Sequence, residues 1–226
     1  MSREVFQGID RDTVYVVGKD RALSRLVAGN PPQPVDYNVF RFQALDATTV
    51  YVAGTDFKLW REQGDYTNRG DHPVDSNVDD FQALDATTVY VLGRDGKLWR
   101  EQPDVEHRGD HPVDANVEDF QALDETTVFV LGTDGKLWKE EGDFNTRALV
   151  ATSVSAFQVV GQNTVYTVQP KPRSPNDNQL WRYDLDTGAQ TLVTEDVGPF
   201  PLFARRARRA GAHRGEARPL ADSERP

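Results

Sequence analysis

The sequence predicts an all-β fold built from small repeated sheets, and three observations support this prediction. The pair Phe-Gln recurs with its phenylalanine at positions 6, 42, 81, 120 and 157, so the spacing is 36, 39, 39 and 37 residues. Each unit is rich in β-branched and aromatic residues, and no stretch of it follows the 3.6-residue period of a helix. A unit of about forty residues cannot bury its own apolar faces, so the units must stack on their neighbours.

The unit that begins near residue 74 shows its expected strands in order. Val78–Leu84 alternates around a phenylalanine and predicts a first strand, and Thr88–Leu92 is apolar on both faces, which is typical of a strand covered on both sides. Asp95-Gly96 follows, and this pair favours a two-residue hairpin turn in which both central residues have a positive φ. We expect the third strand at Lys97–Glu101 and a short fourth strand at Val105–Arg108.

Four short antiparallel strands in each unit are the blade of a β-propeller. We therefore expect a propeller of about five four-stranded blades in residues 1–200, with repeats starting near residues 4, 35, 74, 113 and 152. An incomplete six-bladed propeller is the alternative. The segment Val193–Phe200 matches Val74–Phe81 in pattern. It either pairs with the N-terminal blade and closes a five-bladed ring, which we favour because closure removes exposed edges, or begins a sixth blade.

The copies of the unit differ at two kinds of position. The Asp-Gly turn is replaced by Asp56-Phe57 in the second unit and by Asp20-Arg21 in the first. A side chain at the glycine position costs about 1 kcal/mol when φ is positive, so we expect wider, relaxed turns there. The fifth unit contains six additional residues, and we expect Gln169–Asn178 to form a proline-rich loop.

The charges divide the chain into an acidic body and a basic end. Residues 201–226 hold seven Arg and three acidic side chains, which leaves 19 basic and 33 acidic side chains in residues 1–200. An acidic body repels phosphate backbones, so we expect no nucleic-acid binding by the repeat domain. The basic end has no strand pattern, and we expect a disordered tail at 201–226. A basic arm for an acidic partner and the out-of-frame translation of a GC-rich gene are the alternatives.

The sequence lacks several features, and their absence excludes further classes of site and of protein. The chain has no cysteine, which excludes disulfides and thiolate metal sites. Its first residues hold no apolar stretch of the kind found in a signal peptide, and no segment is long and apolar enough to span a bilayer. We expect a soluble monomer. Its compartment stays open between the cytoplasm and the exterior, since the chain could be part of an exported protein.

The repeat resembles the tectonin and tachylectin type of lectin propeller over residues 4–200. Those repeats also run from an aromatic inner strand to a strand that ends near Asp-Gly, followed by a short apolar-aromatic strand and a basic residue. Here that last part is Asp95–Arg100 and Asp134–Lys139. The resemblance implies carbohydrate binding at several equivalent sites, one for each blade or blade junction. The unit is also similar to uncharacterised tandem repeats of bacterial proteins.

The third strand of each unit carries the candidate ligand-binding residues. Its Trp offers a flat face on which the C–H groups of a sugar ring can pack, beside carboxylates that can accept hydrogen bonds from hydroxyls. Packing between blades is the alternative role of these Trp side chains, because Trp buries a large area wherever the fold recurs. The candidates are Trp60, Trp99, Trp138, Trp181, Arg61, Arg100, Lys139, Arg182, Glu62, Glu101 and Glu140.

Catalysis and metal binding find little support in the sequence. There is no Gly-x-Ser-x-Gly turn, and the acidic residues recur with the repeat, whereas a single active site breaks repeat symmetry. We expect Asp46, Asp85 and Asp124 to accept backbone N–H groups in turns, and no Asp-x-Asp-x-Asp-Gly calcium loop exists. The expectation is a non-catalytic recognition module without catalytic residues, metal or cofactor that binds carbohydrate. A protein-interaction or structural module of a larger bacterial protein is the alternative.

Overall fold

The computed structural model describes residues 5–64, 73–102, 112–142, 146–172 and 174–197. Within these ranges the chain forms five antiparallel sheets that follow one another in sequence, and we number them as blades 1 to 5. The expected all-β architecture of about five blades is confirmed. The basic end at 201–226 lies outside the described residues.

Among the described residues, blades 1, 4 and 5 have four strands each, and blades 2 and 3 have three. Blade 1 contains β1 (Phe6–Gly8), β2 (Thr13–Val17), β3 (Leu23–Val27) and β4 (Gln33–Asp36). Blade 2 contains β5 (Val39–Ala44), β6 (Thr49–Gly54) and β7 (Leu59–Gln63), and blade 3 contains β8 (Val78–Ala83), β9 (Val89–Gly93) and β10 (Leu98–Glu101). Blade 4 contains β11 (Val117–Ala122), β12 (Thr127–Gly132), β13 (Leu137–Glu141) and β14 (Thr146–Ala151). Blade 5 contains β15 (Ala156–Val160), β16 (Thr164–Lys171), β17 (Ser174–Asp184) and β18 (Gln190–Val197).

In the described part of blades 2 and 3, a single bridge is formed with the outer edge of the third strand. Leu59 pairs with Asp75, and Leu98 pairs with Asp114, each as an isolated antiparallel bridge. The fourth strand expected at Val105–Arg108 lies outside the described residues.

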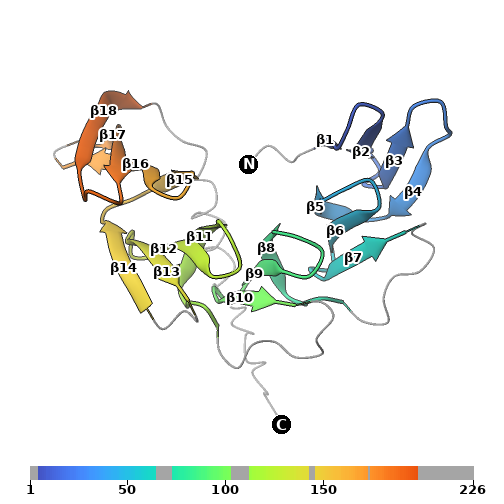
Figure 1. Ribbon diagram of the computed structural model, residues 1–226, viewed down its shortest axis with the longest axis horizontal. Helices are drawn as coiled ribbons and strands as arrows, with labels where there is room; N and C mark the ends of the chain where they lie inside the picture. Colours follow the sequence, from blue (N-terminus) through green and yellow to red (C-terminus); the bar gives the residue numbers. More distant parts are fainter. Residues whose placement is uncertain (1–4, 65–72, 103–111, 143–145, 173, 198–226) are drawn as a thin grey trace, which may run out of the picture.

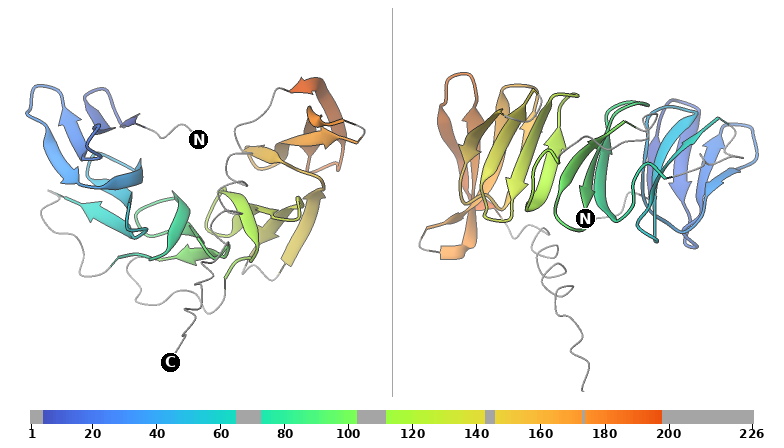
Figure 2. Two further views of the ribbon diagram at one scale, coloured as in Figure 1. Left: turned by 180° about the vertical axis from the view of Figure 1, so that it is seen from behind. Right: turned by 90° about the horizontal axis from the view of Figure 1, so that it is seen from below.

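The blades stand side by side along an open arc, with the first strand of each blade toward the inside (Figure 1). The views in Figure 2 show the same arrangement from behind and from below, with blades 1 and 5 at opposite ends. No strand pairing in the described residues joins these two blades. Over the residues that the structure describes, the ring that we expected to close is therefore open.

The prediction for Val193–Phe200 is wrong in its described part. Residues 193–197 belong to β18, the fourth strand of blade 5, where Thr194 pairs with Leu180 of β17. They neither pair with blade 1 nor begin a sixth blade. Backbone groups must be hydrogen-bonded, and the edge of β17 is the nearest partner along the chain.

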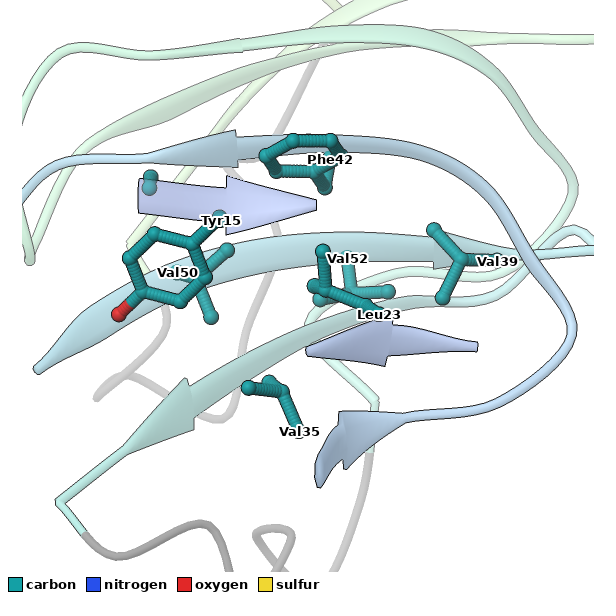
Figure 3. Packing of buried hydrophobic residues seen from close by; sticks show 8 residues of the cluster. Tyr15, Leu23, Val35, Val39, Phe42, Val50 and Val52 are labelled. Atoms are coloured by element: carbon teal, nitrogen blue, oxygen red, sulfur yellow. The ribbon is translucent and has the colours of Figure 1, made fainter. Parts of the chain in front are cut away.

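The second strands form the buried centre of the fold. Every residue of β6 and β9 is buried, which confirms a strand covered on both faces. Their branched and aromatic side chains face the neighbouring blades on either side. Figure 3 shows one such junction, in which Tyr15 and Leu23 of blade 1 lie opposite Phe42 of blade 2.

The same aromatic pair recurs at successive junctions. Ring centres of Tyr15 and Phe42 lie 6.5 Å apart, and the equivalent pairs in the next two junctions are both 6.4 Å apart and similarly tilted. Such tilted pairs add to the stabilisation that burial of the rings provides. The hydroxyl of each tyrosine donates a hydrogen bond to a backbone oxygen of the following blade, as Tyr90 does to Glu125 O at 2.9 Å.

At each junction, a glutamine of the inner strand forms two hydrogen bonds to the backbone of one residue in the next blade, and we call this pair of bonds the glutamine bracket. The Gln82 side-chain amide donates to Ala122 O at 2.8 Å, and its oxygen accepts the Ala122 N–H at 2.8 Å. Gln7, Gln43 and Gln121 make the same pair of hydrogen bonds to the following blade. The Phe-Gln pair that defines the repeat thus supplies both the apolar and the polar contact between blades.

The hairpin between the second and third strands is longer than we expected. Only Gly96 of the Asp95-Gly96 pair has a positive φ, of 80°. The N–H of Gly93 donates to Lys97 O, so the loop spans the three residues Arg94, Asp95 and Gly96, and its glycine closes a bulge. Asp95 holds the loop by accepting the Lys97 N–H at 3.1 Å.

The turns that lack glycine keep this geometry. Phe57 has a φ of 63° and Arg21 a φ of 64°. Each donates its N–H to the backbone oxygen of the glycine three residues earlier, as Gly96 does to Gly93. Our expectation of relaxed turns is therefore wrong. Each turn also accepts a hydrogen bond from the next blade, as Phe57 O does from the Val78 N–H, and this contact fixes the turn.

The additional residues of the fifth unit do not form a loop. They lengthen the hairpin of β16 and β17, in which Gln169 pairs with Gln179 and Pro170 with Asn178. Lys171 in this extension lies 3.6 Å from Asp196 of β18. The predicted loop at Gln169–Asn178 is thus a strand extension at one end of the arc.

Candidate functional site

The structure separates the third-strand residues that the sequence places together. Neighbouring side chains on a strand point to opposite faces, so Trp99 and Glu101 share one face and Arg100 lies on the other. The Arg100 face looks toward blade 4, since its guanidinium donates to Glu125 O at 2.8 Å. The Trp, basic and acidic candidates of one blade therefore do not form one site.

The basic candidates are already engaged in the described structure. Arg61 donates from Nη1 to Ala86 O of the next blade at 2.5 Å, in the same way as Arg100. Lys139 forms an ion pair with Glu141 at 2.7 Å, and Arg182 lies 3.9 Å from Asp184. Arg61 and Arg100 thus fasten their strands to the next blade, whereas the ion pairs of Lys139 and Arg182 lie within their own strands, β13 and β17.

The Trp candidates lie partly buried between blades. Trp181 packs against the apolar cluster that blades 4 and 5 share. The guanidinium carbon of Arg147 stands 4.4 Å from the ring centre of Trp138. Trp60 and Trp99 are likewise half-buried. Each Trp is thus partly covered by its surroundings, which fits the packing role that the sequence offers as the alternative.

The acidic candidates are the most buried members of the set. Glu62 is fully buried, and Glu101 and Glu140 are 4% and 2% exposed. Burial raises the pKa of Glu62 to about 7. Burial, and next the nearby Asp114, raise the pKa of Glu140 to about 7, while Arg147 acts in the opposite direction. These side chains belong to the junctions more than to the surface.

A polar pocket of about 360 Å³ opens between blades 2 and 3. It is formed by the segment that links the two blades and by the hairpin of blade 3. Its polar walls come from Asp75, Ser76, Asn77 and Asp95. Ser76 and Asn77 are exposed, so their hydrogen-bonding groups reach the opening. Pockets of this size can hold a small ligand.

The position of Asn77 follows from the backbone. Asn77 has a φ of 65°, and asparagine is among the few residues that adopt this conformation readily. Its carbonyl accepts the Arg94 N–H at 2.8 Å, which joins the linking segment to the hairpin. Asn38 and Asn116 occupy the same place with similar φ values at the neighbouring junctions. The sequence contained this signal in its recurring asparagine, but we did not predict a site there.

The aromatic ring of Phe57 lies next to the residues that line this pocket. Phe57 is 36% exposed, and the guanidinium carbon of Arg94 lies 4.0 Å from its ring centre. The backbone oxygen of Phe57 accepts a hydrogen bond from Val78, next to Asn77. Arg21 and Gly96 stand at the position of Phe57 in the hairpins of blades 1 and 3, so the junction of blades 2 and 3 differs from its neighbours.

The recurring aspartates at the end of the first strand are turn residues, as expected. The carboxylate of Asp85 accepts the Thr87 N–H at 2.7 Å, and Asp46 and Asp124 make the same contact with Thr48 and Thr126. The backbone N–H of Thr87, and then its hydroxyl, hold the pKa of Asp85 below its ordinary value. In the part of the chain that the structure describes, no three His, Cys, Asp or Glu side chains form a cluster able to hold a metal ion.

Comparison with known proteins shows the fold and no family. No family model matches the chain, and no curated protein matches it. Among solved structures, PorZ of the Porphyromonas gingivalis type-IX secretion system has a TM-score of 0.56 at 10% identity, over 86% of this chain and 30% of that one. The N-terminal domain of Nup159 has a TM-score of 0.52 at 9% identity, over 81% of this chain and 59% of that one.

The WD40 β-propeller domain of Doa1 is similar as well, with a TM-score of 0.51 at 14% identity, over 83% of this chain and 67% of that one. Together with the five blades, these likenesses make the chain a β-propeller. The tectonin and tachylectin resemblance stays a prediction. Within the described residues, no helix has the length and apolarity needed to cross a bilayer.

Proposed function

We propose that the chain is a non-catalytic recognition module that binds carbohydrate at the pocket between blades 2 and 3. The observation that carries this proposal is the combination of a polar pocket with an exposed aromatic ring at its side. Asn77, Ser76 and Asp95 offer amide, hydroxyl and carboxylate groups, which suit the hydroxyls of a sugar. The ring of Phe57 is 36% exposed, and the part that Arg94 leaves uncovered offers an apolar surface for the C–H face of the same sugar.

Related pockets at the other junctions would give weaker, different sites. Asn38 and Asn116 repeat the polar part of the site, whereas the aromatic ring of Phe57 has no counterpart at the same hairpin position in blades 1 and 3. An exposed Tyr37 supplies an aromatic ring at the junction of blades 1 and 2. Several weak sites on one molecule strengthen binding to a surface that carries many copies of the sugar.

The third-strand candidates are a second choice for this role. Arg61 and Arg100 already bind the neighbouring blade, Lys139 and Arg182 lie in ion pairs within their own strands, and the acidic members are buried. A sugar at Trp99 would have to compete with the packing of two blades. The exposed junction pocket requires no such rearrangement.

The test is a glycan array probed with the purified chain and with matched variants. Phe57→Gly removes the ring and places glycine where the next blade has Gly96, so the turn is retained. We expect binding of at least one glycan by the wild-type chain and about tenfold weaker binding by Phe57→Gly, because an aromatic contact is lost. Asn77→Gly keeps the backbone conformation and should weaken binding as well.

Arg21→Gly is the control for these variants. It changes the same hairpin position in blade 1, away from the pocket between blades 2 and 3, and should cause much less loss of glycan binding than Phe57→Gly. Equal binding by all variants would place the sugar elsewhere. A well-folded chain that binds no glycan would end the carbohydrate proposal and favour a protein-interaction or structural module.

A further inference from the structure

The two ends of the arc expose the two halves of one blade junction. We call the exposed side of blade 1 the leading face, defined by Phe6, Gly8, Val14 and Val16. We call the exposed side of blade 5 the trailing face, defined by Gln158, Val160 and Tyr166. Both faces hold the repeat positions that are buried at the four internal junctions.

The leading face lacks the blade that should cover it. Phe6 is 64% exposed, whereas Phe42 and Phe81 at the same position are 2% and 1% exposed. Val14 and Val16 are partly exposed, and the equivalent valines of blades 2 and 3 are fully buried. These side chains are therefore poised to pack against a further blade.

The trailing face lacks its partner in the same way. Val160 is 50% exposed, although the leucines at this position in blades 2 to 4 pack into the next junction. Tyr166 is partly exposed, whereas Tyr51 and Tyr90 are fully buried under the following blade. Gln158 is exposed, and its side chain has no hydrogen-bond partner among the described residues.

The polar groups of the two faces match as well. At each internal junction, the glutamine of one blade binds the N–H and C=O of a single residue in the next blade, as Gln82 binds Ala122. Gly8 occupies the position of Ala122 in blade 1 and is exposed. No atom lies within 4 Å of the place where a side chain at Gly8 would begin. Gln158 and Gly8 are thus the two free ends of a bracket that occurs four times inside the molecule.

We propose that a second copy of this chain completes the junction, with the trailing face of one copy packed on the leading face of the other. The two faces lie at opposite ends of the arc, so they meet between copies (Figures 1 and 2). The Gln158 amide then binds the Gly8 backbone, and Phe6 packs against Tyr166. This contact joins unlike surfaces, so it can link copies into a ring or a longer chain. The inference departs from the monomer expected from the sequence.

Sedimentation equilibrium of the full chain over a range of concentrations tests the proposal. We expect the average mass to rise above 25.4 kDa as the concentration increases. Gln158→Ala should weaken association about tenfold, since it leaves the Gly8 groups unpaired. Phe6→Ser should weaken it too. Both residues are exposed, and circular dichroism checks that the variants keep their fold.

A mixing experiment separates this contact from association through like surfaces. The chain has no cysteine, so Gly8→Cys and Gln158→Cys variants carry one thiol each. We expect an oxidised mixture to form disulfide-linked pairs that contain one copy of each variant, with little cross-linking in either variant alone. The proposal would be overturned if the wild-type chain stays at 25.4 kDa at every concentration. Cross-linking of the cysteine variants only between identical copies would overturn it too.

Discussion

At the scale of residues, the fold tolerates groups that are costly to bury. Glu62 and Glu140 lie inside blade junctions, and burial raises the pKa of each to about 7. A glutamic acid that keeps its proton is neutral, which reduces the cost of burial. Glu140 pairs across the sheet with Arg147, which also lies 3.8 Å from Asp114. These groups make the stability of the molecule depend on pH.

We predict that Glu140→Gln reduces the loss of stability with rising pH. The folded state keeps the Glu140 proton up to about pH 7, whereas the unfolded chain releases it near 4.5. The stabilisation is therefore complete below pH 4.5 and is lost as the pH rises through about 7. Glutamine stays neutral, so the variant should exceed the wild-type chain in stability at about pH 8 but not at about pH 5.

Urea unfolding at these two pH values measures the effect. Glu141→Gln, a change at the exposed neighbour, is the control and should leave the pH dependence as it is. Part of the dependence should persist in Glu140→Gln, because Glu62 titrates in the same range. An unchanged pH dependence in Glu140→Gln would show that this carboxyl is ionised in the folded protein.

At the scale of elements, the junction between blades is the repeated unit of stability. The inner strand of each blade contributes a phenylalanine toward the preceding blade and a glutamine toward the following one. The second strand contributes an aromatic ring, and the hydroxyls of Tyr15, Tyr51 and Tyr90 bond to the next turn. Each blade is thus completed by its neighbour, in the manner of repeat proteins.

We predict that Gln82→Ala lowers the free energy of unfolding by about 1–3 kcal/mol, because it leaves the N–H and C=O of Ala122 without their partner. Gln158→Ala is the matched control, since the same side chain has no partner in blade 5 among the described residues. Denaturant unfolding at low protein concentration, where copies are apart, measures both. A similar loss of unfolding free energy in the two variants would mean that the Gln158 side chain is hydrogen-bonded to another part of its own chain.

The sequence predicted these elements because their signals are local. The repeat spacing, the branched residues of β6 and β9 and the Asp-Thr turns follow from pattern alone, and the structure confirms them. The prediction of a relaxed turn at Phe57 was wrong, because a hydrogen bond from the next blade overrides the preference of phenylalanine for a negative φ. The predicted position of Val193–Phe200 was wrong because the sequence of this segment resembles an inner strand. Its described part, in β18, pairs instead with the neighbouring edge of β17.

The candidate site was less predictable than the fold. The third-strand residues were chosen for their chemistry, but strand alternation places Arg100 opposite Trp99, and burial removes Glu101 from the surface. The junction pocket depends on two segments that meet only in the folded chain. Its residues are common turn formers, so their types alone do not distinguish a binding site from a turn.

At the scale of the whole molecule, the five blades form an arc whose ends are separate and complementary. The leading face exposes Phe6, and the trailing face exposes Gln158 and Val160. A closed propeller would bury both faces. The proposed association of copies follows from the same contacts that hold the internal junctions together.

A disulfide test on the double variant Gly8→Cys/Gln158→Cys addresses this claim most directly. Both thiols are then on one chain that otherwise has none, and mass analysis after oxidation reveals which pairs form. We predict disulfides between chains, with masses that are multiples of 25.4 kDa. A disulfide within a single chain would show that the arc closes on itself, and the absence of any disulfide would show that the two faces do not meet.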